Sequence, residues 1–201
     1  MFVNAKGFKR LIKQAYNNWG LHIEHTEGMY AIASNRWTME IIDTRLPKSI
    51  KACLIELIGD LPGDGEGIVA RKKEAPQEEF GITSKGLEKI FDRMTHDITE
   101  SNVRFLQDTD WLAVYQDVGT GTKLAINATF ADLIDESELN EQEGECSPGY
   151  PRTDSYRVIW SNNVMQFMCY KRDIKYWKEQ ELMNALEETD IVYNFSEEEL
   201  I

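Results

Sequence analysis

Residues 5–33, AKGFKRLIKQAYNNWGLHIEHTEGMYAIA, change their hydrophobic period part-way along, and this change predicts the fold class. Up to Gly20 the apolar residues recur at helical spacing, which indicates an amphipathic helix with one buried face. From Leu21 onward apolar and polar residues alternate, as in a half-buried strand. Glu27-Gly28 then reads as a turn before a returning strand over 29–33. The segment therefore predicts a helix followed by an antiparallel hairpin.

The same two patterns recur along the rest of the chain. Further strands are expected at 37–42, 103–107, 111–117, 123–127, 156–160 and 164–170, and further helices at 47–58, 87–94 and 175–188. Because helices and hairpins are segregated, the pattern predicts an α+β protein, with antiparallel β hairpins or sheets and amphipathic helices. Each half begins and closes with a helix around hairpins, so two similar helix-plus-sheet subdomains are one possible arrangement.

Composition suggests where the chain divides. Residues 71–79 are highly charged and interrupted by a proline, which is typical of a linker or an exposed loop. The expected units are an N-terminal helix-plus-hairpin subdomain at 1–75, an acidic α+β subdomain at 84–188 and a mobile acidic tail at 189–201. A single domain is the alternative.

The charge of the chain is unevenly distributed. The 201 residues carry a net charge of −13. Residues 1–75 hold 11 Lys and Arg against 9 Asp and Glu, a balance of +2, and residues 76–201 hold 11 against 26, a balance of −15. The acids concentrate in a loop at 132–145 and in the tail from 187. Such a distribution bears on the choice of partners and not on the fold.

A stripe of cations on the first helix is the candidate binding site. It consists of Lys6, Lys9, Arg10 and Lys13, at positions i, i+3, i+4 and i+7. No acidic residue precedes Glu24. Such a stripe can contact nucleic-acid phosphates, dock on an acidic protein, or face the acidic segments of its own chain. It can also be a solvated helix face.

No motif predicts a metal, a cofactor or a reaction. His22 and His25 are three residues apart in an expected strand, so they point to opposite faces and do not predict a metal site. The stretch at 119–123, Gly-Thr-Gly-Thr-Lys, lacks the spacing of a phosphate-binding loop and reads as a hairpin turn. Acidic neighbours would raise the pKa of Cys146 and suppress its thiolate. A non-enzyme is therefore favoured, although an enzyme with a site assembled from distant loops stays open.

The sequence favours a soluble protein of the cytoplasm with no membrane partner. No stretch approaches the roughly 18 to 20 apolar residues that span a bilayer. The basic N-terminus is not followed by the uninterrupted apolar region of a signal peptide. Three widely spaced cysteines do not form a disulfide framework, so reduced thiols are expected.

Two stretches resemble the helix-plus-hairpin repeats of sliding DNA clamps: LHIE at 21–24 with EGMYAI at 27–32, and residues 103–115. The resemblance carries no functional residue across and implies only a clamp-like architecture. The leading expectation is a non-enzymatic binding or regulatory protein that acts through protein–protein contacts. The alternative is a nucleic-acid-associated protein of clamp-like architecture, with the first helix facing the phosphates.

Overall fold

The computed structural model describes residues 1–80, 86–139 and 151–187, together with 189 and 191. The strands are β1 (Leu21–Thr26), β2 (Met29–Ala33), β3 (Trp37–Ile42), β4 (Glu66–Ala70), β5 (Gln77–Phe80), β6 (His96–Gln107), β7 (Asp110–Asp117), β8 (Lys123–Asn127), β9 (Arg152–Thr153), β10 (Arg157–Ser161) and β11 (Met165–Tyr170). The helices are α1 (Ala5–Asn18), α2 (Lys48–Ile58), α3 (Leu87–Arg93), α4 (Ala128–Ala131) and α5 (Trp177–Glu187), and the 3-10 helices are η1 (Asp43–Arg45) and η2 (Glu136–Leu139).

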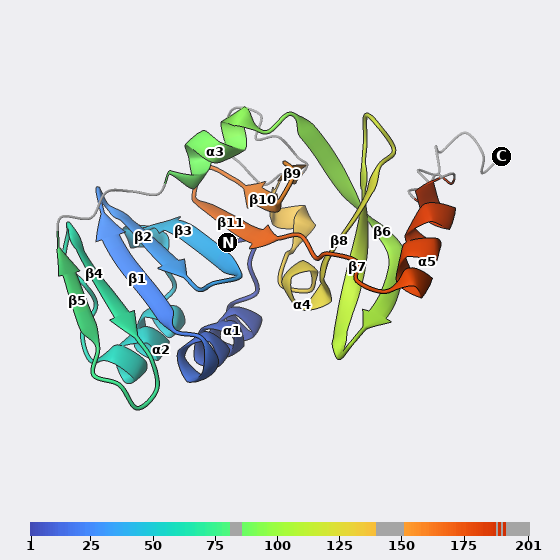
Figure 1. The fold of residues 1–201 in the computed structure, drawn as a ribbon. Coiled ribbons are helices and arrows are strands. Elements are labelled where there is room, and N and C mark those ends of the chain that lie inside the picture. Colours follow the sequence, from blue (N-terminus) through green and yellow to red (C-terminus); the bar gives the residue numbers. More distant parts are fainter. Residues whose placement is uncertain (81–85, 140–150, 188, 190, 192–201) are drawn as a thin grey trace.

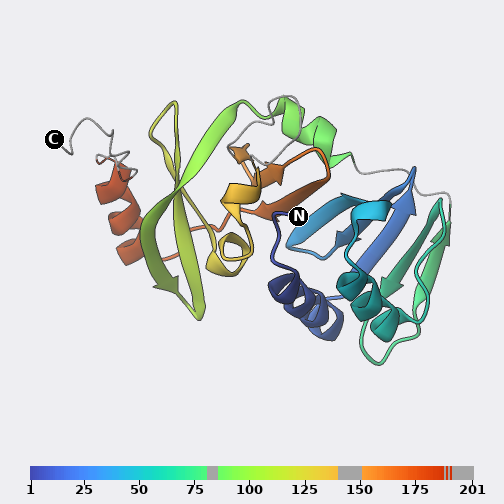
Figure 2. The same ribbon diagram turned by 180° about the vertical axis from the view of Figure 1, so that it is seen from behind.

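The strands form one sheet in the order β5-β4-β1-β2-β3-β11-β10-β9-β6-β7-β8, and each pair of neighbours is antiparallel. The predicted α+β class with antiparallel hairpins is therefore confirmed. Helices α1 and α2 lie side by side against one face of the strands β1 to β4 (Figures 1 and 2). Helix α3 packs on the opposite face, over β10 and β11.

The helix and hairpin predicted from residues 5–33 are confirmed, and their boundaries have local causes. The Asn4 side chain accepts a hydrogen bond from the Gly7 amide at 3.0 Å and caps the start of α1. After α1, Gly20 takes a positive φ of 99°, which few other residues tolerate. Glu27 and Gly28 also have positive φ, 53° and 75°, as a tight hairpin turn between β1 and β2 requires.

The sheet joins the two parts of the sequence. Strand β11 pairs with β3, so the late hairpin β10–β11 extends the sheet of the early hairpin β1–β2. The expected subdomains at 1–75 and 84–188 thus share a sheet, and their division stays a prediction. The expected tail at 189–201 lies outside the described residues, apart from 189 and 191.

The expectation of a linker or exposed loop at 71–79 is wrong for its last residues. Residues 77–80 form the edge strand β5, which pairs with β4. All four residues of this strand are exposed. No alternation of apolar and polar residues was therefore available to reveal it. The pairing with β4, and not burial, defines the strand.

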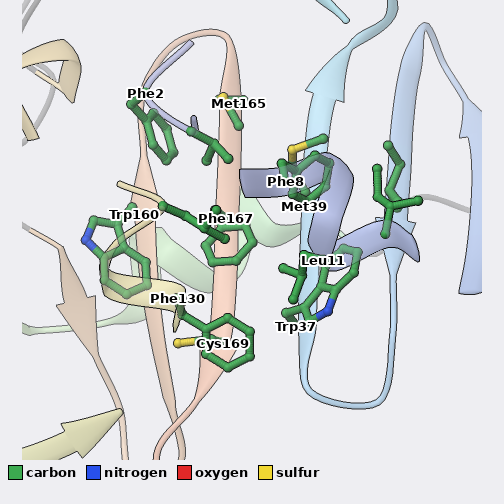
Figure 3. Packing of buried hydrophobic residues seen from close by; sticks show 14 of the residues in the cluster. Phe2, Phe8, Leu11, Trp37, Met39, Phe130, Trp160, Met165, Phe167 and Cys169 are labelled. Atoms are coloured by element: carbon green, nitrogen blue, oxygen red, sulfur yellow. The ribbon is translucent and has the colours of Figure 1, made fainter. Parts of the chain in front are cut away.

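The main core lies between the sheet and helices α1, α2 and α4, and it uses residues from both ends of the chain (Figure 3). Phe8 of α1 meets Trp37 of β3 edge to face, with ring centroids 5.3 Å apart. Phe167 of β11 contacts Phe8, at 6.5 Å, and Trp160 of β10, at 6.1 Å. Phe130 of α4 packs on the same Phe167 ring. This aromatic cluster holds the buried side of α1 against the sheet. The opposite side of α1 therefore faces outward.

A smaller core lies at the far end of the sheet. Met183 of α5 packs with Leu112 and Val114 of β7. About half of the residues of α5 are polar.

None of the helices in the described part of the chain is long and apolar enough to cross a membrane.

Candidate binding face on helices α1 and α2

Helix α1 turns its cations away from the sheet because its apolar stripe packs into the core. The buried residues of α1 are Phe8, Leu11, Ile12 and Ala15. Of the four predicted binding residues, Lys6, Arg10 and Lys13 are exposed and Lys9 is partly exposed. The structure therefore brings the predicted stripe to the surface on one element.

Helix α2 adds to this surface. Lys48 in its first turn is exposed, as are Ala52 and Ile55 further along, and the Ile55 side chain keeps 45% of its area accessible. We call the surface formed by these residues of α2 and the four cations of α1 the basic face. Its members are Lys6, Lys9, Arg10, Lys13, Lys48, Ala52 and Ile55. Sequence reasoning missed the residues of α2, because their position beside α1 depends on tertiary packing.

Most of the α1 cations are not neutralised by the protein. Lys13 lies 3.3 Å from Glu56 of α2, but both side chains are exposed, so this pair contributes little to stability. Lys6, Lys9 and Arg10 make no ion pair or side-chain hydrogen bond with any other residue that the structure describes. These three charges are available for a partner as far as the described residues are concerned.

Two acids of the acidic loop at 132–145, Asp132 and Glu138, contact other parts of the protein. The Asp132 carboxylate accepts a hydrogen bond from Arg104 at 2.6 Å. The Glu138 carboxylate lies 2.9 Å from the amino terminus of Met1. Residues 140–145 fall outside the described part of the chain. Asp132 and Glu138 therefore direct their charges to Arg104 and to the amino terminus, and not to the cations of α1.

A thiol is buried beneath the basic face. Cys53 of α2 is buried, and this burial raises the pKa of its thiol, while the nearby Lys13 and Lys9 act in the opposite direction. A buried thiol with a raised pKa is a poor nucleophile. Burial raises the pKa of Cys169 as well. Cys146, weighed as a nucleophile from the sequence, lies outside the described residues.

On the opposite face of the sheet, a row of polar and small residues crosses seven strands. The residues in register, from β5 to β10, are Glu79, Gly67, Glu24, Ala31, Glu40, Gln166 and Ser161. We call this set the polar row. Glu24 and Glu40 are buried in it. The Glu40 carboxylate accepts a hydrogen bond from the Leu87 amide at 2.8 Å, at the first residue of α3.

A polar hollow of about 470 Å³ is lined by residues of β6, β7, β8 and β9, and by Lys171 just after β11. Burial raises the pKa of Asp117, but the amides of Thr120 and Gly119 and the imidazole of His96 outweigh it, and the pKa lies below its ordinary value. Burial lowers the pKa of Lys171 in the same hollow. A histidine held by a carboxylate is a general-base arrangement. In the described part of the chain, however, no hydroxyl or thiol hydrogen-bonds to the imidazole of His96.

No protein-family model and no curated protein sequence matches this chain. Two solved structures show a distant likeness. One is the Helicobacter pylori β clamp in complex with 5-chloroisatin, with 10% identity, a TM-score of 0.35, and coverage of 89% of this chain and 64% of that one. The other is the β subunit of a Streptococcus pyogenes DNA polymerase, with 9% identity, a TM-score of 0.37, and coverage of 90% and 66%. The chain thus spans just under two thirds of the length of either structure.

Proposed function

We propose that this chain is a non-enzymatic binding protein whose basic face docks on an acidic surface of a protein partner. The observation that supports the proposal most strongly is the outward position of Lys6, Lys9 and Arg10, which make no ion pair with the described residues. Such charges steer an anionic partner and set its orientation. The remainder of the chain carries an excess of acids, which disfavours binding of an anionic partner elsewhere.

The composition of the basic face favours a protein partner over nucleic acid. Protein interfaces combine a less polar centre with a charged rim. Here Ala52 and Ile55 are exposed on α2, which packs beside the cationic helix α1. A partner with an apolar patch bordered by acids matches both features.

Charge reversal tests the proposal. The test variant carries Lys6→Glu, Lys9→Glu, Arg10→Glu and Lys13→Glu. The control variant carries Lys72→Glu, Lys73→Glu, Lys89→Glu and Arg93→Glu, four exposed cations with the same residue types and the same change in net charge. We expect the unaltered chain and the control to retain one host protein at about 0.15 M salt, and the test variant to lose it by more than tenfold.

Three results would refute the proposal: equal loss by both variants, equal retention by both, or no retained protein. Nucleic acid is measured in the same series by fluorescence anisotropy with a duplex DNA. If the chain binds this DNA and only the α1 reversal abolishes binding, the nucleic-acid alternative replaces the proposal. Circular dichroism of each variant shows that the fold is intact, as expected for exposed side chains.

A further inference from the structure

Two carboxylates converge on one imidazole nitrogen at the β5 edge of the polar row. The Nε2 atom of His22 lies 3.2 Å from Oε1 of Glu24 and 3.0 Å from Oε2 of Glu79. One candidate ligand atom from each side chain lies within 4.8 Å of the other two. From the sequence, His22 reads as an ordinary strand histidine, because His25 points to the opposite face and a zinc site needs three or four convergent ligands. Glu79 supplies a further candidate ligand from a strand that the sequence does not reveal.

The register of the sheet explains the convergence. Gly67 of β4 is paired with Glu24 of β1 on one side and with Glu79 of β5 on the other. Paired residues in antiparallel strands point to the same face, and so do residues two apart in one strand. Because Gly67 has no side chain, the two carboxylates can meet above it. His22, two residues before Glu24, completes the group on that face.

The distances match those between the ligands of one metal ion. Zinc binds histidine nitrogen and carboxylate oxygen at about 2.0–2.2 Å. Two such ligands lie about 2.9 Å apart at a right angle and about 3.4 Å apart at the tetrahedral angle. The observed 3.0 and 3.2 Å fall between these values.

The donor set and its surroundings narrow the choice of ion. An imidazole nitrogen suits zinc, copper, iron or nickel, whereas calcium and magnesium prefer oxygen ligands. Glu24 is buried, His22 is partly exposed and Glu79 is exposed, so an ion can enter from the solvent. His22 also borders a hollow of about 430 Å³, which leaves room for a water as the fourth ligand.

We propose that His22, Glu24 and Glu79 bind a divalent transition-metal ion, with zinc as the best match, and that the ion fastens the edge strand β5 to β1. All residues of β5 are exposed, so the strand buries no apolar side chain that would hold it in place. Its attachment rests on the ladder to β4 and on the contact between Glu79 and His22. An ion shared by β1 and β5 would bridge the intervening strand. This proposal is independent of the basic face.

Titration of the full chain with zinc chloride, followed by calorimetry, tests the site. We expect one zinc ion per chain and weakening by at least tenfold in both His22→Ala and Glu79→Gln. The matched control is Glu78→Gln, because Glu78 is the adjacent exposed residue of β5 and points to the other face. It should change the affinity less than twofold. Magnesium chloride at the same concentration should not compete.

A second readout follows the strand itself. Zinc should slow amide hydrogen exchange in β5 in the unaltered chain and in Glu78→Gln, but not in Glu79→Gln. The proposal is overturned if zinc shows no saturable binding, if Glu78→Gln weakens binding as much as Glu79→Gln, or if bound zinc leaves exchange in β5 unchanged. Glu79 is exposed, so its replacement does not endanger the fold.

Discussion

Asp117 shows how one residue at the end of a strand combines several stabilising contacts. Its Oδ1 atom accepts hydrogen bonds from the amides of Gly119 and Thr120, both at 2.8 Å, and its Oδ2 atom lies 2.7 Å from Nδ1 of His96. These contacts hold the tight turn between β7 and β8 in place. They also hold the pKa of Asp117 below its ordinary value, although burial acts in the opposite direction.

Replacing Asp117 by Asn should therefore produce a pH-dependent loss of stability. A lowered carboxyl pKa stabilises the fold fully above the ordinary value, and this contribution is lost as the pH falls through the lowered pKa. At pH 7 we expect a loss of about 1–3 kcal/mol in the free energy of unfolding. The difference from the unaltered chain should shrink as the pH falls below about 4. Urea unfolding at several pH values measures it, and a constant difference would contradict the account.

Phe8 of α1 is a member of the aromatic cluster. It is fully buried and contacts Trp37 of β3 and Phe167 of β11, two strands that are far apart in the sequence but neighbours in the sheet. We expect Phe8→Ala to lower the free energy of unfolding by about 3–5 kcal/mol, because it removes apolar contacts and leaves a cavity. Chemical denaturation measures the loss. Gln14→Ala, on the exposed side of the same helix, should stay within about 0.5 kcal/mol. Equal effects of the two changes would refute this packing.

Among the elements, helix α3 depends on a side chain of strand β3 to cap its first turn. The helix is short, and the residue before it, Gly86, provides no side-chain cap. Glu40 of β3 supplies the acceptor for the Leu87 amide from the polar row. A negative charge at a helix start is also favourable for the helix dipole. The packing of α3 over β10 and β11 is thus linked to a buried carboxylate far away in the sequence.

Removing this acceptor should loosen α3 specifically. We expect Glu40→Ala to cost about 1–3 kcal/mol, because it leaves a buried amide without its partner. Glu40→Gln retains an oxygen acceptor of the same size and should recover most of the loss. Hydrogen exchange at the α3 amides separates the two variants. Equal exchange rates in Glu40→Ala and the unaltered chain would show that the contact does not stabilise the helix.

The elements that could be predicted from the sequence are those with a local signature. Helix α1 and the hairpin β1–β2 carry their period and their turn residues within one short segment. Strand β5 has no buried residue, and β9 spans only Arg152–Thr153, so both are defined by pairing partners alone. The same reason explains which site residues could be predicted from the sequence. The α1 stripe lies on one helix, whereas Glu79 reaches His22 only through the register of three strands.

For the whole molecule, the order of strands determines which surfaces exist. The pairing of β11 with β3 places the late hairpin beside the early one and closes the aromatic cluster under α1. No local pattern encodes this long-range pairing, which is why the sequence left one domain and two subdomains as alternatives. The result is a molecule with cations on its helical face and buried acids in the polar row on the opposite face of the sheet.

Site-specific photo-crosslinking in the native host tests the basic face most directly. A photoreactive amino acid replaces Arg10 on α1 in one version of the chain and Lys89 on α3 in the other, both at exposed positions. The account predicts that position 10 captures one protein through an acidic segment, that capture falls as salt rises, and that position 89 does not capture it. Capture of nucleic acid from position 10, or of the same protein from both positions, would contradict it.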